Sequence, residues 1–184
     1  MSNNTPLIVD LDHTLIDTDL LYESSVATLK KRPWLILVYP FWFIQGKGYL
    51  KEQLIKHCKI DITTLPYNQT TIDYIKQRKE QGAKIILATA SHEFYAQQVA
   101  QHTALFDDVM ASNKHFNLSS HNKADKLVER FGDKGFDYMG DHMRDLPVWQ
   151  AANLAVLTNV SDKVIRKTQH LNRLVLSKKQ SNLT

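Results

Sequence analysis

Short apolar runs alternate with longer amphipathic stretches through most of the chain. The apolar runs predict five buried strands, over Leu7–Val9, Lys84–Ala88, Asp108–Ala111, Phe136–Met139 and Leu154–Leu157. Helical periodicity lies between them, over Thr70–Gln81, His92–His102, Asn122–Phe131 and Met143–Ala151. Strands that alternate with helices of this length predict an α/β fold, a Rossmann-like three-layer sandwich with a central parallel sheet between two layers of helices.

The segment between the first two predicted strands does not follow this alternation. It contains no strand, and its helical stretches lie near Leu20–Lys31, Trp34–Ile44 and Tyr49–Lys59. We expect residues 17–65 to form a small helical cap inserted after the first strand, with residues 1–16 and 66–184 as the core domain. This cap would lie over the carboxyl ends of the strands, where open α/β sheets bind ligands.

The most apolar stretch of the chain is residues 33–44 (PWLILVYPFWFI), which Pro40 interrupts. It is too short to span a bilayer as a helix. One interpretation is that this stretch packs against the other cap helices. The other is peripheral contact with a membrane surface, since aromatic side chains with basic flanks suit the headgroup region. The polar N-terminus shows no secretory signal, so we expect a cytoplasmic location, membrane-peripheral under the second interpretation.

Composition and charge exclude several classes of protein. With 43% hydrophobic and 23% charged residues, the composition is that of a globular domain. The single cysteine, Cys58, excludes an intramolecular disulfide and a Cys-based zinc site, and is consistent with a reducing compartment. The net charge of +4 is concentrated near the C-terminus, in Lys163, Arg166, Lys167, Arg173, Lys178 and Lys179. We interpret this part as a basic, solvated tail and do not expect nucleic-acid binding.

Two carboxylates follow the first apolar run, in the sequence LIVDLDHTL that begins at Leu7. Asp10 and Asp12 are two residues apart, which places them on the same side of an extended chain. Charges at the end of a buried strand require solvent or a cation, and paired acids can bind Mg²⁺. The Thr14 hydroxyl can hold the loop in place. The alternative is a capped turn after an edge strand, since Asp and Thr favour both.

The pattern D-x-D-x-T-L resembles the first motif of the haloacid dehalogenase (HAD) superfamily. The other motifs of that superfamily are matched in order. Thr89 follows the second apolar run, Lys123 lies near a predicted helix start, and Asp141 follows the fourth run, with Asp145 four residues later. The resemblance covers roughly Pro6 to Thr158 and implies a HAD-like core.

The resemblance also implies a Mg²⁺-dependent phosphomonoester hydrolase. Asp10 would be the nucleophile that forms an aspartyl-phosphate, and Asp12 would be the general acid and base. Asp10, the main-chain carbonyl of Asp12 and Asp141 would bind the metal. Asp145 would act from outside this ligand set by orienting the waters of the metal.

Several residues of the implied site have competitors. Thr89 would donate a hydrogen bond to the phosphoryl group; Ser91 is the alternative, and we prefer Thr89 as ligand and Ser91 as helix cap because Thr89 directly ends the apolar run. Lys123 would neutralise phosphoryl oxygens, with Lys114 and Lys126 as rivals.

Two histidines lie close to the implied motifs. His142 follows Asp141, but the histidines show no pair at metal-ligand spacing, so we do not expect it to be a ligand. His13 stands where the superfamily usually has glycine or another small residue, and it can narrow the mouth of the site.

A closer resemblance is to the phosphatase-like domain fused ahead of some ubiquinone-type prenyltransferases. It rests on the sequences at Thr18–Leu21, Arg32–Trp34, Leu65–Asn68, Leu127–Gly132 and Asp145–Trp149. The chain would then be a free-standing relative or a separated fragment, and its substrate a small or lipid-linked phosphate. The alternatives are a phosphotransferase or mutase with the same intermediate, and a non-catalytic module that docks on a membrane or a prenyltransferase. Dehalogenation is disfavoured because it does not need the acid/base Asp12.

Overall fold

The computed structural model describes residues 5–176. Six parallel strands form one sheet in the order β3-β2-β1-β4-β5-β6. Their bounds are β1 (Leu7–Val9), β2 (Ile85–His92), β3 (Asp108–Ser112), β4 (Asp137–Gly140), β5 (Leu154–Thr158) and β6 (Arg173–Leu176). The strand order reverses between β1 and β4, and ligands bind beyond the carboxyl ends of strands at such a point.

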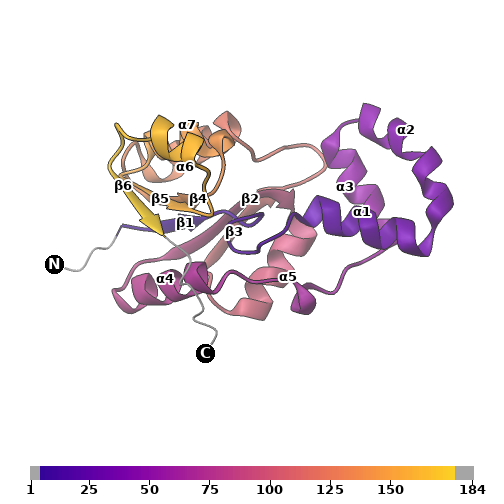
Figure 1. Cartoon of the computed structure of the whole chain (residues 1–184), viewed down its shortest axis with the longest axis horizontal. Helices are drawn as coiled ribbons and strands as arrows, with labels where there is room; N and C mark the ends of the chain where they lie inside the picture. The colour runs from indigo at the N-terminus through magenta and orange to yellow at the C-terminus, as the bar shows by residue number, and fades with distance from the viewer. Residues whose placement is uncertain (1–4, 177–184) are drawn as a thin grey trace.

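Helices cover both faces of the sheet (Figure 1). One face carries α4 (Gln69–Glu80) and α5 (Glu93–Thr103), and the other carries α6 (His121–Phe131) and α7 (Leu146–Ala151). The alternation of side chains along β1 explains the two layers. Leu7 and Val9 pack in one core cluster with Ile75 of α4, whereas Ile8 packs in the other with Leu127 of α6. The predicted three-layer α/β sandwich is confirmed.

The basic C-terminal stretch is not simply a solvated tail. Residues Asp162–Lys167 form helix α8, whose Val164 is buried in the core, and β6 pairs with β5 as an edge strand. The prediction was wrong here because a few apolar positions among many charges are enough to pack a short helix and an edge strand. Lys178 and Lys179 lie outside the described residues.

A helical segment is inserted between β1 and α4. It consists of α1 (Leu20–Lys31), η1 (Pro33–Leu37), α2 (Tyr39–Ile44), α3 (Lys47–His57) and the short turn η2 (Ile62–Thr64). Helices α1, α2 and α3 project to one side of the sheet (Figure 1). Leu35, Trp42, Leu50 and Leu54 form a small core of their own within it. We refer to residues 20–57 as the cap segment.

The apolar stretch 33–44 is broken into two helical pieces that meet at Val38. Pro40 is the second residue of α2, a place that tolerates proline, whereas the interior of one longer helix does not. Only Leu35 and Trp42 of this stretch are buried. The expectation that it packs against the other cap helices therefore holds only in part, because its large apolar side chains are exposed at Trp34, Ile36, Leu37, Phe41, Phe43 and Ile44. Their exposed fractions range from 53% for Ile36 to 81% for Ile44.

None of the helices within residues 5–176 combines the length and the apolar character needed to cross a bilayer.

Candidate active site

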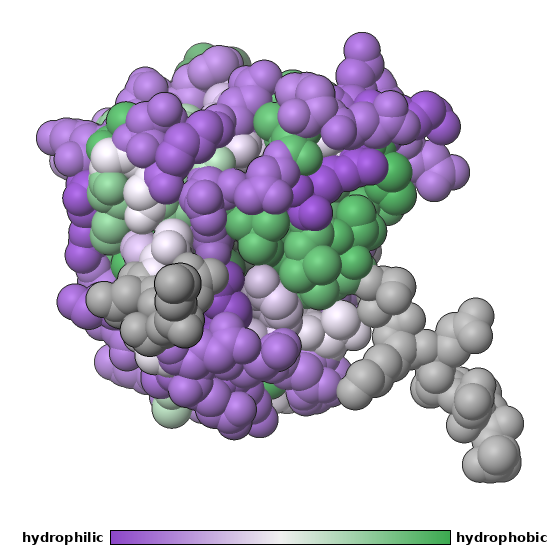
Figure 2. All heavy atoms as spheres, turned by 90° about the vertical axis from the view of Figure 1, so that its left-hand side faces the viewer, coloured by the Kyte–Doolittle hydropathy of each residue, from purple (hydrophilic) through white to green (hydrophobic). Residues whose placement is uncertain are grey.

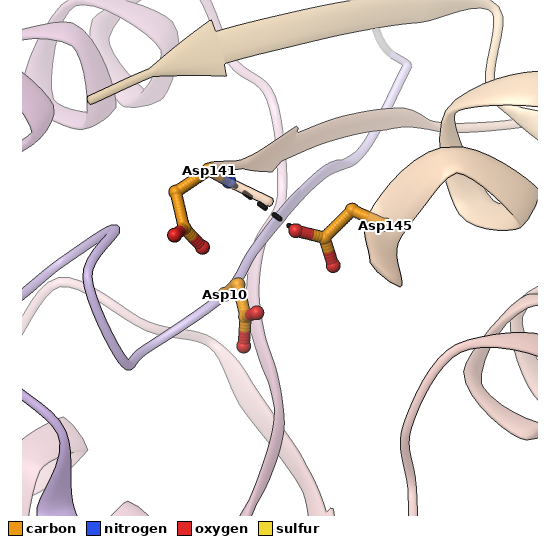
Figure 3. A group of neighbouring side chains, drawn as sticks. All are labelled: Asp10, Asp141 and Asp145. Atoms are coloured by element: carbon orange, nitrogen blue, oxygen red, sulfur yellow. Dashed lines mark hydrogen bonds between the residues drawn. The ribbon is translucent and has the colours of Figure 1, made fainter. Parts of the chain in front are cut away.

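The carboxyl ends of β1 and β4 bring three carboxylates together, those of Asp10, Asp141 and Asp145 (Figure 3). One oxygen atom from each lies within 4.8 Å of the other two. Asp10 directly follows β1, and its main-chain N–H donates to the carbonyl of Met139 in β4 at 3.0 Å. The pairing of β1 with β4 therefore holds the two acidic loops side by side.

Gly140 at the end of β4 allows Asp145 to approach the main chain closely. A Cβ atom at Gly140 would lie 2.7 Å from Oδ2 of Asp145 and 2.9 Å from a ring carbon of Tyr138. In the space this leaves, Oδ2 of Asp145 accepts hydrogen bonds from the N–H groups of Asp141 (3.2 Å) and His142 (3.1 Å). The Asp145 carboxylate is thus buried in one fixed orientation.

Lys123 connects Asp10 to this buried carboxylate. Its Nζ lies 3.1 Å from Oδ1 of Asp10 and donates to the Tyr138 hydroxyl at 2.8 Å. That hydroxyl donates in turn to Oδ1 of Asp145 at 2.9 Å. Lys123 is only 2% exposed, so its charge acts on Asp10 with little screening by solvent.

Burial and mutual repulsion raise the pKa of Asp141 and of Asp10. Burial and the charges of Asp145 and Asp10 raise the pKa of Asp141 to about 8. Burial raises the pKa of Asp10 to about 6, although Lys123 opposes the shift. Acids crowded in this way need a proton or a cation among them. Because Mg²⁺ prefers hard oxygen ligands, this donor set fits a divalent cation of that kind.

The carboxylate of Asp12 lies on the side of the cap segment. Its Oδ1 accepts from the N–H of Leu20, the first residue of α1, at 2.9 Å, and its Oδ2 accepts from the Ser91 hydroxyl at 2.6 Å. Burial and the nearby charge of Asp19 raise the pKa of Asp12. A carboxyl with a raised pKa can carry a proton and release it, as a general acid must.

The junction of β2 and α5 differs from the prediction. β2 continues to His92, so Thr89 lies inside the strand, and its buried hydroxyl accepts from the N–H of Ser91 at 2.9 Å. His92 caps α5, because its Nδ1 accepts from the N–H of Phe94 at 3.2 Å. The prediction that Ser91 caps this helix was wrong: a register irregularity between Thr89 and His92 delays the helix start, and the Ser91 hydroxyl binds Asp12 instead.

Thr14 and the two rivals of Lys123 were also singled out in the sequence. The Thr14 hydroxyl donates to Oδ1 of Asp141 at 3.4 Å, so it joins the two acidic loops. Lys114 and Lys126, the rivals of Lys123, are both exposed, and Lys126 pairs with Glu129.

His13 has a φ of 58°, in the left-handed region that glycine adopts most easily. This conformation explains why a small residue suits the position. The His13 side chain is exposed and is not among the residues that line the pocket, so it does not narrow the mouth of the site.

A pocket opens between the acidic cluster and the cap segment. Its wall includes Lys47 and Lys51 from α3, Arg144 from η3 (Met143–Asp145), and polar residues of the loop before α6. The Nζ of Lys51 donates to the main-chain carbonyl of Ala90. Sequence reasoning did not place these cations at the site, because isolated basic residues look like an ordinary solvated face until the fold brings them over the site.

Residues 7–150 match the family of haloacid dehalogenase-like hydrolases. The chain belongs to this family. The matched range contains every residue that the sequence proposed for the site: Asp10, Asp12, Thr89, Lys123, Asp141 and Asp145.

One relative of this hydrolase-family chain is the uncharacterized protein y4nM of Sinorhizobium fredii. The two are 38% identical over 153 residues, which is 83% of this chain and 29% of that protein. The chain thus spans less than a third of the length of this curated relative.

Several solved structures share the fold of this family member. A predicted phosphatase from Clostridium acetobutylicum superposes with a TM-score of 0.69 at 16% identity, covering 95% of this chain and 94% of that one. Phosphoserine phosphatase in its apo form gives 0.67 at 12% identity over 96% of both chains. A phospho-aspartyl intermediate analogue of phosphoserine phosphatase gives 0.65 at 13% identity, over 96% of this chain and 95% of that one. At these identities the likeness concerns the fold alone.

Proposed function

We propose that this protein is a Mg²⁺-dependent phosphomonoester hydrolase that acts through an aspartyl-phosphate on Asp10. The observation that carries the proposal is the cluster of Asp10 with Asp141, Asp145 and the buried Lys123, next to Asp12 with its raised pKa. A nucleophile, cation ligands, a positive charge and a proton donor are the groups that transfer of a phosphoryl group requires. The family and the phosphatase folds it resembles support the same chemistry.

The metal ligands in this proposal are Asp10, the main-chain carbonyl of Asp12, and Asp141. Asp145 lies close enough to join them or to orient their waters, and its three hydrogen bonds hold it rigidly in either role. Bound Mg²⁺ would neutralise charge on the phosphoryl oxygens and keep Asp10 ionised for attack.

The reaction has two steps that share the same pair of aspartates. First, a carboxylate oxygen of Asp10 attacks phosphorus, the bond to the leaving oxygen breaks, and Asp12 gives that oxygen its proton. Then Asp12, now ionised, takes a proton from water, whose oxygen attacks phosphorus and displaces Asp10. Inorganic phosphate leaves and both aspartates return to their starting states.

Other residues position the phosphoryl group. Lys123 neutralises its oxygens as a point charge, because its Nζ lies beside the attacking carboxylate. Thr89 remains the proposed hydroxyl ligand, because its oxygen accepts from the N–H of Ser91 and its own O–H can still donate to the substrate. Residues 17–65 act as a cap over this site, between the two parts of the core, 1–16 and 66–184.

Two competing functions are a phosphotransferase or mutase and a non-catalytic binding module. A phosphotransferase or mutase would pass the phosphoryl group to an acceptor alcohol in place of water, and it would reveal itself by phosphorylated acceptor. A non-catalytic module would dock on a membrane or a prenyltransferase without turnover. Hydrolysis is favoured over the module because Asp10, Asp12, Asp141 and Lys123 all point into one pocket.

The test of the hydrolase proposal is phosphate release from a panel of phosphomonoesters, including polyprenyl phosphates, with Mg²⁺ or with EDTA. We expect release only with Mg²⁺, and loss of release in Asp10→Asn. Asp133→Asn, which alters an exposed acid outside the pocket, serves as the matched control and should keep full activity. If no ester of the panel releases phosphate, the non-catalytic module is favoured.

The exposed apolar side chains of residues 33–44 favour a second part of the proposal, peripheral contact with a membrane that carries a lipid-linked phosphate. Six large apolar side chains are exposed there, and Lys30, Lys31, Arg32 and Lys47 flank them. Such a surface suits the boundary between acyl chains and anionic headgroups. The resemblance to domains fused to prenyltransferases points to the same class of substrate by analogy.

Sedimentation with lipid vesicles tests this contact. We expect the protein to bind vesicles that contain anionic lipid, and Leu37→Glu with Ile44→Glu to abolish binding. Tyr22→Ser, which removes an exposed aromatic of α1 outside the stretch, should leave binding unchanged. Equal binding by all three proteins, or no binding by any, would reject the contact.

A further inference from the structure

Three positive charges in the pocket wall have no part in the proposed chemistry. Lys47 and Lys51 come from helix α3 of the cap segment, and Arg144 comes from η3 in the core. Lys47 and Lys51 are four residues apart, so they lie on the same face of α3. They therefore line the pocket from the cap side, opposite the carboxylates proposed to bind metal.

Lys51 is partly buried, whereas Lys47 and Arg144 are exposed. The Nζ of Lys51 donates to the main-chain carbonyl of Ala90, next to Ser91 on β2, so it crosses from the cap segment to the core. Burial lowers the pKa of Lys51, and the neighbouring charges of Lys47 and Arg144 lower it further, against the opposing effect of Asp12 and Asp19. Lys47 and Arg144 thus lie close enough to Lys51 to repel its charge.

Carboxylates do not neutralise these cations directly. Within residues 5–176, Lys47, Lys51 and Arg144 form no ion pair, in contrast to Lys123, which pairs with Asp10. The two acids whose charges act on Lys51 already accept hydrogen bonds from other groups. Asp12 accepts from Leu20 and Ser91, and Asp19 accepts from the first N–H groups of α1.

The position of Asp12 relates these cations to the substrate. In the proposed reaction, Asp12 protonates the leaving oxygen, so the alcohol part of the substrate lies beside its carboxylate. That carboxylate lies on the cap side, between the start of α1 and Ser91. Lys51 acts electrostatically on Asp12 from the same side. The alcohol part would therefore lie among Lys47, Lys51 and Arg144.

We propose that Lys47, Lys51 and Arg144 form a subsite for a second anionic group, so that the preferred substrates are phosphomonoesters whose alcohol part carries a carboxylate or another phosphate. This inference rests on the proposed hydrolase function and narrows its substrate class, small or lipid-linked phosphates, to esters that carry a second anionic group. Lys51 supplies a partly buried charge, and Lys47 and Arg144 supply exposed charges at the rim. Hydrogen bonds between ionised partners are stronger than neutral ones, so this contact discriminates between otherwise similar esters.

Matched substrate pairs test the subsite. One pair is 3-phosphoglycerate with glycerol 3-phosphate, and the other is fructose 1,6-bisphosphate with fructose 6-phosphate. The wild-type protein should prefer the more anionic member of at least one pair by about tenfold or more in kcat/KM, because a charge-assisted contact contributes that much discrimination. Lys51→Met should remove most of this preference, mainly by raising the KM of the more anionic member.

Two further variants control the interpretation. Lys56→Met alters an exposed lysine on the same helix that pairs with Glu52 and does not line the pocket, so the preference should be unchanged. Arg144→Gln, at an exposed position, should reduce the preference even if Lys51→Met fails to fold. Equal kcat/KM within both pairs, or a preference that Lys51→Met and Arg144→Gln both retain, would overturn the subsite.

Binding separates a failure of the subsite from a failure of the hydrolase. Calorimetric titration of Asp10→Asn with the same four compounds, in the presence of Mg²⁺, needs no turnover. Tighter binding of the more anionic member to Asp10→Asn, and loss of this difference when Lys51→Met is added, would support the subsite even if no ester is hydrolysed. Hydrolysis without any difference in binding or in kcat/KM within the pairs would overturn the subsite and leave the hydrolase standing.

Discussion

Single residues determine how the protein responds to protons and metal. Asp141 has a pKa of about 8, against an ordinary value of 3.8 that the unfolded chain is expected to have. The folded protein therefore keeps a proton that the unfolded chain releases, and this stabilises the fold. The stabilisation is complete below the unfolded pKa of 3.8 and is lost as pH rises through about 8. Asp10, whose pKa is raised to about 6, adds a further loss of stability as pH rises through about 6.

We predict that the Tm of the protein in EDTA falls as pH rises from acidic values through about 8. Asp141→Asn cannot lose this proton, so the fall should be shallower in that variant. Mg²⁺ should raise the Tm of the wild-type protein most at high pH, where protons do not compete for the carboxylates, and raise that of Asp141→Asn much less. Thermal melts across pH, with EDTA or Mg²⁺, measure both effects. Parallel pH profiles for the two proteins would contradict this account of Asp141.

The sequence allowed the reactive residues to be proposed but not the residues that support them. Asp10, Asp12 and Asp141 follow apolar runs, and the ends of parallel strands meet at one edge of a sheet whatever the details of packing. Tyr138, by contrast, joins Lys123 to Asp145 only because β4 and α6 pack together. Nothing in the local sequence marks that tyrosine as different from any other buried aromatic residue.

At the junction between β2 and α5, two adjacent side chains have different roles. His92 caps α5, whereas the hydroxyl of the preceding residue, Ser91, holds the carboxylate of Asp12. The two adjacent side chains therefore differ in what their removal changes, although the sequence alone favoured Ser91 as the cap.

We predict opposite effects for alanine at these two positions. His92→Ala should lower the free energy of unfolding by about 1 kcal/mol, as the loss of a helix cap does. It should leave kcat nearly unchanged. Ser91→Ala should lower kcat, because Asp12 loses a partner, with a smaller effect on stability. Urea denaturation and phosphate release measure the two properties, and a larger loss of stability in Ser91→Ala would contradict the assignment of the cap.

At the scale of elements, long periodic segments were predicted better than short or interrupted ones. Helix α1 has the expected bounds, Leu20–Lys31, because Asp19 caps its start and Pro33 follows its end. One helix was expected within the apolar stretch, over Trp34–Ile44. The chain forms two helical pieces there, which meet at Val38 just before Pro40. Strand β6 was missed because four residues at a sheet edge carry too little pattern to recognise.

At the scale of the whole molecule, the proposed active site and a buried ion pair lie at opposite ends of the sheet. The acidic cluster lies at the carboxyl ends of the strands, and a buried ion pair lies at the amino ends. There, Arg78 of α4 lies 2.8 Å from the carboxylate of Asp137, the first residue of β4, and donates to the carbonyl of Thr5 ahead of β1. Asn153 donates to the other oxygen of Asp137. These bonds tie α4 to the sheet.

We predict that Arg78→Met destabilises the fold without altering the chemistry. Asp137 would remain buried without its partner, and such a loss costs about 3–5 kcal/mol in the free energy of unfolding. The double variant with Asp137→Asn should recover part of that loss. Urea denaturation measures the stability, and kcat per folded molecule should stay at the wild-type value. A loss below about 1 kcal/mol, the range of exposed pairs, would show that solvent reaches the pair.

The end opposite to the cap segment is covered mainly by hydrophilic side chains, with an apolar area on part of it (Figure 2). The exposed apolar side chains of residues 33–44 lie in the cap segment, which projects from the other side (Figure 1). No periodicity in the sequence shows which side chains of a short apolar stretch remain exposed, because that depends on how the cap helices pack.

The most direct test of the account is to look for a phosphoryl group on Asp10. The protein is mixed with Mg²⁺ and a good substrate from the panel, quenched in acid within one turnover, digested, and analysed by mass spectrometry. We predict that the peptide containing Asp10 gains the mass of one phosphoryl group, that hydroxylamine removes it, and that Asp10→Asn shows neither adduct nor turnover. Phosphate release that persists in Asp10→Asn, or an adduct on a different residue, would contradict the central claim.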